Sequence, residues 1–101
     1  MDVRFFRTSL DEPVPPADLG TALEALWFQG RGDWDRAHEL AQAEDGRDGA
    51  WVHAHLHRVE GDQANTDYWY RRAGRPQARG DLQVEWVEIV SALLAARPAR
   101  T

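Results

Sequence analysis

Three residues in one stretch, His53, His57 and Glu60, have types and spacing that suit metal binding or acid–base chemistry. If residues 50–60 form a helix, the positions i, i+4 and i+7 share one stripe, because an α-helix has about 3.6 residues per turn. Two imidazoles and a carboxylate on one face suit a divalent cation such as Zn²⁺, which at catalytic sites takes three protein ligands and keeps a position open. The same groups suit proton transfer in an acid–base enzyme.

A structural role for these histidines is the competing interpretation. The zinc-protease motif is absent, because Ala54 stands where that motif needs a glutamate. The stripe then borders the core, with each ring hydrogen-bonded to a carboxylate or backbone group. His38 lies on the apolar stripe of an earlier segment and is either a satisfied core histidine or, if it faces His53 or His57, a further metal ligand. His55 points to the opposite side of the helix, and we assign it no role.

A second group of candidate binding residues follows in the next segment and consists of Asn65, Tyr68, Arg71, Arg72 and Arg75. Tyr68 precedes Arg71 and Arg72 by one helical turn, so a phenol and a guanidinium can face one carboxylate or phosphate group. In the alternative interpretation, the arginines favour the negative end of the helix dipole and pair with nearby acids such as Asp67.

Composition favours a single domain over residues 1–101 and narrows the classes of partner. All twelve basic residues are arginine, seventeen residues are acidic, and the net charge of −5 argues against nucleic-acid or anionic-membrane binding. The absence of cysteine excludes disulfides and thiolate zinc sites and suits a reducing compartment. No apolar stretch approaches the roughly 20 residues of a membrane span, and the first residues lack a signal-peptide core. We therefore expect a soluble, cytoplasmic protein.

Apolar residues recur with helical spacing in five segments. The first is 17–29, and the second runs from residue 34 to the start of the polar loop 44–49. The other three are 50–60, 63–73 and 82–97. Asp33, Asp62 and Asp81 are suited to cap the segments that follow them, and Gly61 is suited to end the third. Leu82 is expected to face the core, as are Trp69 and Tyr70 of the fourth segment. Residues 1–16 are expected to form an extended arm rather than part of a sheet, because a single strand in this chain would have no other strand to pair with.

The order helix, Gly-Asp turn, helix occurs twice, with the turns at 32–33 and 61–62. Glycine ends one helix and aspartate caps the next, which predicts two antiparallel helical hairpins beneath a closing C-terminal helix. The all-α fold class follows from this pattern.

Two resemblances accompany the repeat. Gly-Asp-Trp-Asp-Arg-Ala-His-Glu-Leu-Ala, residues 32–41, resembles the turn and second helix of a tetratricopeptide repeat, although the turns are closer together than that family's period of about 34 residues. Val-His-Ala at 52–54, Leu-His-Arg at 56–58, Glu-Gly-Asp at 60–62, Asn65 and Tyr-Trp-Tyr-Arg-Arg-Ala-Gly-Arg at 68–75 resemble a motif of short uncharacterised bacterial proteins. This second resemblance implies no particular activity.

Two functions are compatible with these patterns. The favoured one is a small helical interaction module that binds a peptide, a protein partner or a second copy of itself through the groove beside residues 50–60 and 63–73. The alternative is a metal-dependent or acid–base enzyme, or a small-ligand binder, centred on His53, His57 and Glu60. Nucleophile and phosphate-loop motifs are missing, so catalysis is less favoured, and no cofactor is expected unless a divalent metal binds. Apolar residues spread beyond one stripe in residues 82–97, which suits a homodimer.

Overall fold

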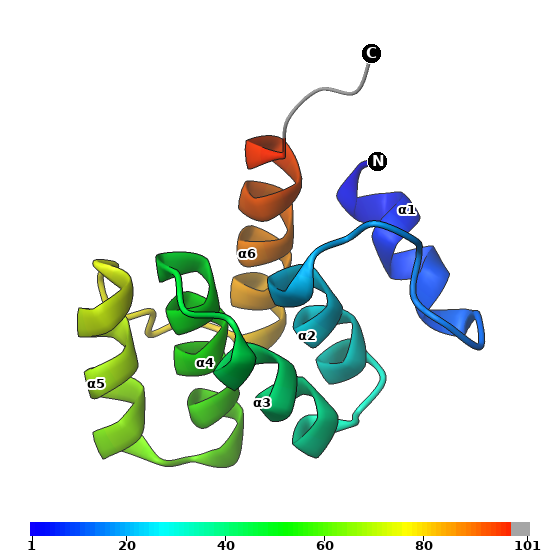
Figure 1. Cartoon of the computed structure of the whole chain (residues 1–101). Helices are drawn as coiled ribbons and strands as arrows, with labels where there is room; N and C mark the ends of the chain where they lie inside the picture. The colour runs from blue at the N-terminus through cyan, green and yellow to red at the C-terminus, as the bar shows by residue number, and fades with distance from the viewer. Residues whose placement is uncertain (98–101) are drawn as a thin grey trace.

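The computed structural model describes residues 1–97, and this part of the chain is all-α, with no β-strand. Six α-helices and one short 3₁₀ helix follow one another (Figure 1): α1 Val3–Thr8, η1 Ser9–Asp11, α2 Thr21–Gly30, α3 Trp34–Ala43, α4 Arg47–Glu60, α5 Gln63–Ala73 and α6 Leu82–Ala96. The predicted all-α class is therefore confirmed, but six α-helices are present where the sequence patterns predicted five, and a short 3₁₀ helix was not predicted.

Helix α4 lies between the other long helices and contacts α2, α3, α5 and α6 (Figure 1). Helix α2 packs in turn against α3 and α6. The radius of gyration of 12.7 Å matches the roughly 13 Å expected for a compact chain of about 100 residues. Within the described residues, none of the helices has the length and apolar character needed to cross a membrane.

Aspartate caps begin three of the helices at the predicted positions. The side chain of Asp33 accepts a hydrogen bond from the backbone N–H of Arg36, and Asp62 and Asp81 cap α5 and α6 in the same way. Helix α4 ends at Gly61, whose φ of 88° is a left-handed conformation that glycine adopts without steric cost. These local signals explain why the bounds of α5 agree with the prediction for 63–73.

Two other boundaries differ from the prediction. Helix α2 begins at Thr21 rather than at residue 17, because Asp18 and Gly20 both have positive φ and interrupt the helix. Helix α4 begins at Arg47 within the predicted polar loop 44–49. A Cβ atom on Gly49 would lie 2.4 Å from the backbone oxygen of Glu44, so a glycine at this position allows that loop to pass close to the helix.

The prediction of an extended arm over residues 1–16 is wrong. Residues of this segment form α1 and η1, and Phe6 is completely buried, with its ring centroid 5.7 Å from that of Trp86. Asp2 caps α1 through the backbone N–H of Phe5, and the hydroxyl of Ser9 accepts a hydrogen bond from Trp27 Nε1 at 3.1 Å. The segment is thus anchored to α2 and α6 by both apolar and polar contacts.

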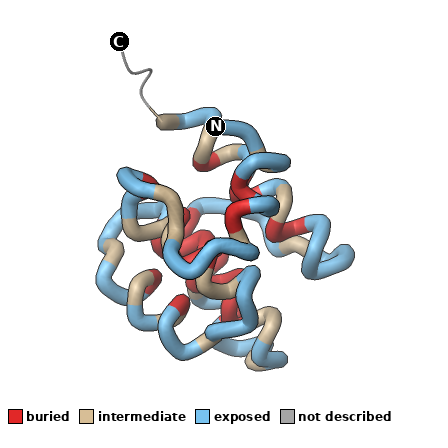
Figure 2. The backbone as a smooth tube through the Cα atoms, turned by 90° about the vertical axis from the view of Figure 1, so that its right-hand side faces the viewer, coloured by how far each residue is buried: buried red, intermediate tan, exposed pale blue. Residues whose placement is uncertain are grey.

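The buried residues follow the helices toward the middle of the molecule (Figure 2), and Trp27, Trp51 and Trp86 are the bulkiest aromatic residues among them. The expectation that Leu82 faces the core is wrong: it opens α6 and is 36% exposed. The apolar residues of 82–97 that spread beyond one stripe include Val87 and Leu94, and both pack partly against the core of their own chain.

The buried contact of Phe6 predicts that α1 contributes to stability. Phe6→Ala should lower the free energy of unfolding by about 3 kcal/mol, because it removes a fully buried ring from the surface of Trp86. Urea unfolding followed by circular dichroism measures this change. Phe5→Ala is the matched control, because Phe5 is 59% exposed on the same helix. Equal stability of the two variants would contradict the docking of α1.

Candidate metal centre of three histidines

Three histidines from two helices converge beside α4. His38 comes from α3, and His53 and His57 come from α4, one turn apart. One ring nitrogen from each histidine can be chosen so that all three atoms lie within 4.8 Å of one another. The Nε2 atoms of His38 and His53 are 2.9 Å apart, so one of these rings carries a proton and donates it to the other. His38 therefore faces His53, as its role as a further metal ligand requires.

Glu60 fixes the third ring. Its carboxylate accepts a hydrogen bond from His57 Nδ1 at 2.9 Å, one turn along α4. This contact assigns the proton of a neutral His57 to Nδ1 and leaves the lone pair of Nε2 free. A carboxylate in this position is the usual orienting partner of a metal-bound histidine. Glu60 therefore belongs to the cluster as an orienting group, whereas the sequence spacing treated it as a ligand.

Two indoles flank the histidines. Trp34 stacks on His38 with ring centroids 4.8 Å apart, and its Nε1 donates to the backbone oxygen of Leu56 at 2.8 Å. On the other side, Trp69 stacks on His53 at 3.8 Å. Trp69 was expected in the core, and it is partly buried at the border, where it covers the imidazole. The rings are thus held in defined orientations.

The environment keeps the two hydrogen-bonded histidines neutral. Burial, which has the largest effect, and the nearby rings of His38 and His57 together lower the pKa of His53 to about 4. Burial also lowers the pKa of His38, with His57 adding to the effect while Glu60 and Asp35 oppose it. At neutral pH both rings therefore have a lone pair, which is the form that binds metals.

One polar atom of the cluster lacks a partner among residues 1–97. His53 is 2% exposed, and its Nδ1 atom is buried and makes no hydrogen bond with any residue of this described part. Most buried polar side-chain atoms in proteins are hydrogen-bonded, so this atom is a departure from a well-satisfied core. If the three rings were ordinary core histidines, each would have its own carboxylate or backbone partner. His57 has such a partner, and His53 does not.

A second group that shares His57 is less suitable for a metal ion. His57, Glu60 and Asp62 also bring ligand atoms within 4.8 Å of one another. However, the carboxylate of Asp62 is engaged at the start of α5, where it accepts hydrogen bonds from the backbone N–H and the side-chain amide of Asn65. Binding a metal there would compete with this cap. The three imidazoles are the better donor set.

The other predicted binding residues lie elsewhere, on the exposed surface of α5 and just beyond it: Asn65, Tyr68, Arg71, Arg72 and Arg75. Arg72 donates to the Tyr68 hydroxyl at 2.9 Å and also lies over the ring of Trp69. Arg75 stacks on Trp51 at 3.8 Å. Among the described residues these arginines form no ion pair with an acid, so the expected pairing with residues such as Asp67 is wrong.

Sequence reasoning missed a buried network on the opposite side of α4. Glu85 of α6 is 4% exposed and accepts hydrogen bonds from His55 Nδ1 at 2.7 Å, from Arg58 at 2.8 Å and from the Tyr70 hydroxyl. Burial alone would raise the pKa of Glu85, but these hydrogen bonds outweigh it and hold the pKa below its usual value. His55, to which no role was assigned, is therefore part of the core. The only sequence signal was a glutamate next to the apolar stripe of residues 82–97.

The lowered pKa of His53 predicts an acid-sensitive fold for the metal-free protein. Between pH 6.5 and about 4 the unfolded chain binds a proton at this position that the folded chain does not, so stability falls as the pH falls. His53 should account for a loss of up to about 3 kcal/mol over this interval. Urea unfolding in the presence of a chelator measures it. His53→Phe, which keeps the stacked ring, should flatten this part of the profile; an unchanged profile would contradict the assignment.

Comparison with protein families, with curated proteins and with solved structures finds no match for this chain. The feature with the most specific chemistry is the convergence of His38, His53 and His57, oriented by Glu60 and enclosed by Trp34 and Trp69.

Proposed function

We propose that this protein binds a divalent transition-metal ion, with Zn²⁺ as the reference case, through His38, His53 and His57. The observation that carries the proposal is the approach of three ring nitrogens from α3 and α4 to within 4.8 Å of one another. Imidazole nitrogen is a preferred ligand of zinc, copper, iron and nickel ions, and no thiolate is available in this chain.

The spacing of the nitrogens is close to that of a bound ion. With Zn–N bonds of about 2.0–2.1 Å, the ligands of a tetrahedral zinc ion lie about 3.3 Å apart. The pair His38 and His53 is slightly closer than this, at 2.9 Å, and the whole set spans no more than 4.8 Å. Side-chain movements on the order of 1 Å would bring the three nitrogens to the metal-bound spacing.

Three further features support the site. Glu60 orients His57, which completes the carboxylate–histidine arrangement common beside metals. The neutral state of His38 and His53 removes competition from protons. A metal would also replace the hydrogen bond between His38 and His53, in which only one of the two facing Nε2 atoms can carry the proton. Three protein ligands leave a fourth position for water, whose pKa a zinc ion lowers to about 7.

Zinc binding should depend on each of the three rings. Titration calorimetry at pH 7 should give one Zn²⁺ per chain. His38→Gln or His57→Gln should weaken zinc binding by at least about 100-fold, because only two of the three imidazole ligands remain. Co²⁺ should give the visible absorption of a tetrahedral site. Glu60→Gln should weaken binding by about 10- to 100-fold, because the orienting carboxylate is lost.

Two controls separate the site from general effects of substitution. His55→Gln removes the fourth histidine, which lies on the other side of α4, and should leave zinc affinity unchanged in protein whose circular dichroism is native. Glu39→Gln makes the same charge change as Glu60→Gln at a side chain that is 68% exposed on α3. Absence of stoichiometric zinc from the unaltered protein, or equal affinity in His57→Gln, would refute the proposal.

The surface of α5 supports a second function, binding of a peptide or protein partner. Tyr68 is 42% exposed, and the neighbouring Trp69 and Arg72 line a hollow of about 120 Å³ between α5 and the segment that joins α3 to α4. Exposed tyrosine and arginine are enriched among residues that dominate protein interfaces. This proposal also includes the finer architecture, in which α2 with α3 and α4 with α5 form two tetratricopeptide-like hairpins.

The double variant Tyr68→Ala, Arg71→Ala should lose a partner that the unaltered chain captures, because it removes the exposed phenol and a guanidinium one turn away. The matched control is Phe5→Ala, Arg4→Ala, which removes an exposed aromatic and an exposed arginine from α1. Quantitative affinity capture with both double variants compares the surfaces. Retention of the same partners by the α5 variant would exclude this surface.

A further inference from the structure

One surface of this acidic protein has a local excess of positive charge. Residues 68–80 contain four arginines and no acidic residue, although the net charge of the whole chain is −5. Arg72 and Arg75 are both exposed at the end of α5. A third guanidinium, that of Arg47 at the start of α4, lies 3.8 Å from the position that a Cβ atom on Gly74 would take. We call Arg47, Arg72 and Arg75 the arginine cluster.

Aromatic rings orient two of these guanidinium groups. Arg75 lies over the ring of Trp51, with its Cζ atom 3.8 Å from the ring centroid. Arg72 donates to the Tyr68 hydroxyl at 2.9 Å, and its Cζ atom is 5.5 Å from the ring centroid of Trp69. A guanidinium over a ring keeps N–H groups in its own plane for pairing with the two oxygens of a carboxylate. The rings therefore reduce the conformational freedom that binding an anion would otherwise remove.

Acidic side chains of the protein do not neutralise the cluster. Among residues 1–97, no carboxylate lies within ion-pair distance of its three guanidinium groups. Glu44 and Asp45 line the hollow of about 120 Å³ that Arg47 and Arg72 also line, but neither pairs with them. Exposed charges more than about 8 Å apart are largely screened at physiological ionic strength, so the local charge outweighs the net charge at this surface.

The same contacts favour carboxylates over nucleic-acid bases. Proteins that bind single-stranded nucleic acid without sequence preference offer free aromatic faces on which the bases stack. Here Arg75 covers the ring of Trp51, and Trp69 is stacked on His53 at 3.8 Å, so both indoles are engaged within the protein. An extended anionic membrane would also meet the negative charge of the rest of the chain, whereas a short peptide meets the cluster alone.

We propose that the arginine cluster binds an acidic peptide segment of a partner protein, with glutamate or aspartate carboxylates paired to its guanidinium groups. The exposed phenol of Tyr68 provides an apolar contact beside these pairs. This proposal rests on the proposed role of the α5 surface in partner binding, and it adds the chemical class of the partner.

Fluorescence anisotropy with a labelled peptide of four Glu-Gly repeats tests the proposal on the full chain in the presence of a chelator. The peptide should bind, and a Gln-Gly peptide of the same length should bind at least about tenfold more weakly, because it has no side-chain carboxylates. Raising the salt concentration from about 50 mM to about 500 mM should weaken binding at least about fivefold, because salt screens exposed charges. The chelator keeps the result independent of the proposed zinc site.

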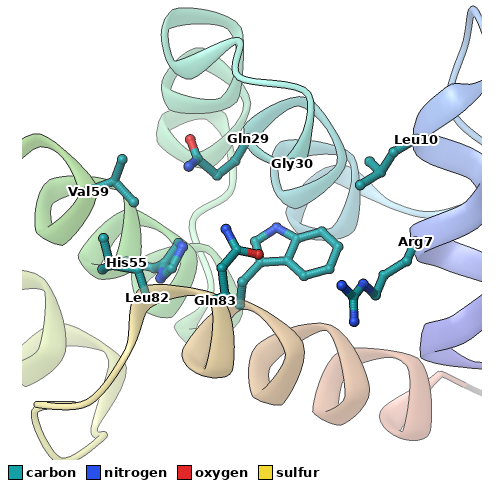
Figure 3. Close-up of a pocket in the computed structure, with 9 residues that line it drawn as sticks. Arg7, Leu10, Gln29, Gly30, His55, Val59, Leu82 and Gln83 are labelled. Atoms are coloured by element: carbon teal, nitrogen blue, oxygen red, sulfur yellow. The ribbon is translucent and has the colours of Figure 1, made fainter.

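Variants locate the contact. Arg72→Gln, Arg75→Gln should weaken binding of the Glu-Gly peptide by about tenfold or more. The matched control is Arg4→Gln, Arg7→Gln, which makes the same change in net charge at two exposed side chains of α1, on the opposite side of the molecule from α5 (Figure 1). Figure 3 shows Arg7 beside a separate cavity of about 220 Å³ that Trp86 also lines. The control should bind the peptide as the unaltered chain does.

Removing the neighbouring acids should have the opposite effect. Glu44→Gln, Asp45→Asn removes two carboxylates that line the hollow with Arg47 and Arg72, so repulsion of an acidic peptide falls. Affinity for the Glu-Gly peptide should rise about twofold or more. Unchanged affinity in this variant would show that the peptide does not lie at the arginine cluster.

Three further results would overturn the proposal. The first is no binding of the Glu-Gly peptide at a protein concentration of about 1 mM, at which a site with a Kd of about 1 mM is half-occupied. The second is an equal loss of affinity in the two arginine variants, which would reflect net charge alone. The third is tighter binding of an oligothymidylate or of phosphatidylserine vesicles than of the peptide.

Failure of this proposal can be told apart from failure of the α5 surface as a partner site. If Tyr68→Ala, Arg71→Ala loses a captured partner while the Glu-Gly peptide does not bind, the surface is retained and the acidic class of partner is refuted. If the Glu-Gly peptide binds and Arg72→Gln, Arg75→Gln weakens it, the acidic class is supported.

Discussion

The burial of a histidine-rich helix on all its sides governs this structure. Every residue of α4 from Gly49 to His57 is buried, and three of them are histidines. Because water cannot satisfy these rings, each needs a partner within the protein. His53 meets His38 of α3, His57 meets Glu60, and His55 meets Glu85 of α6. The neighbours of α4 are therefore positioned by polar contacts as well as by apolar packing.

Alternate spacing of the histidines gives α4 two chemically different sides. Successive residues of an α-helix turn by about 100°, so positions 53 and 57 share one side and position 55 faces the other. On the first side, the neutral imidazoles of His38 and His53 face each other beside His57, and these three rings form the donor set of the proposed metal site. On the second side, the carboxylate of Glu85, which also accepts hydrogen bonds from Arg58 and Tyr70, fixes His55 beside a cavity. One central helix thus separates the three-histidine cluster from the buried network around Glu85.

The parts of the fold set by local signals were predictable, and those set by contacts distant in sequence were not. The caps at Asp33, Asp62 and Asp81 act within one turn, so the helices they begin were placed correctly. The stripe of His53, His57 and Glu60 also follows from spacing within one helix. The pairing of His55 with Glu85, 30 residues away, has no local signature. Helix α1 was missed because its stability depends on Phe6 reaching Trp86 rather than on a long apolar repeat.

A crystal structure of the zinc-loaded protein, with anomalous scattering recorded at the zinc absorption edge, tests the three-histidine site. We expect one strong anomalous peak, bonded at about 2.0–2.1 Å to nitrogens of His38, His53 and His57, with Glu60 still hydrogen-bonded to His57 Nδ1. A peak coordinated by other residues, or three rings that keep their present contacts without a metal among them, would contradict it.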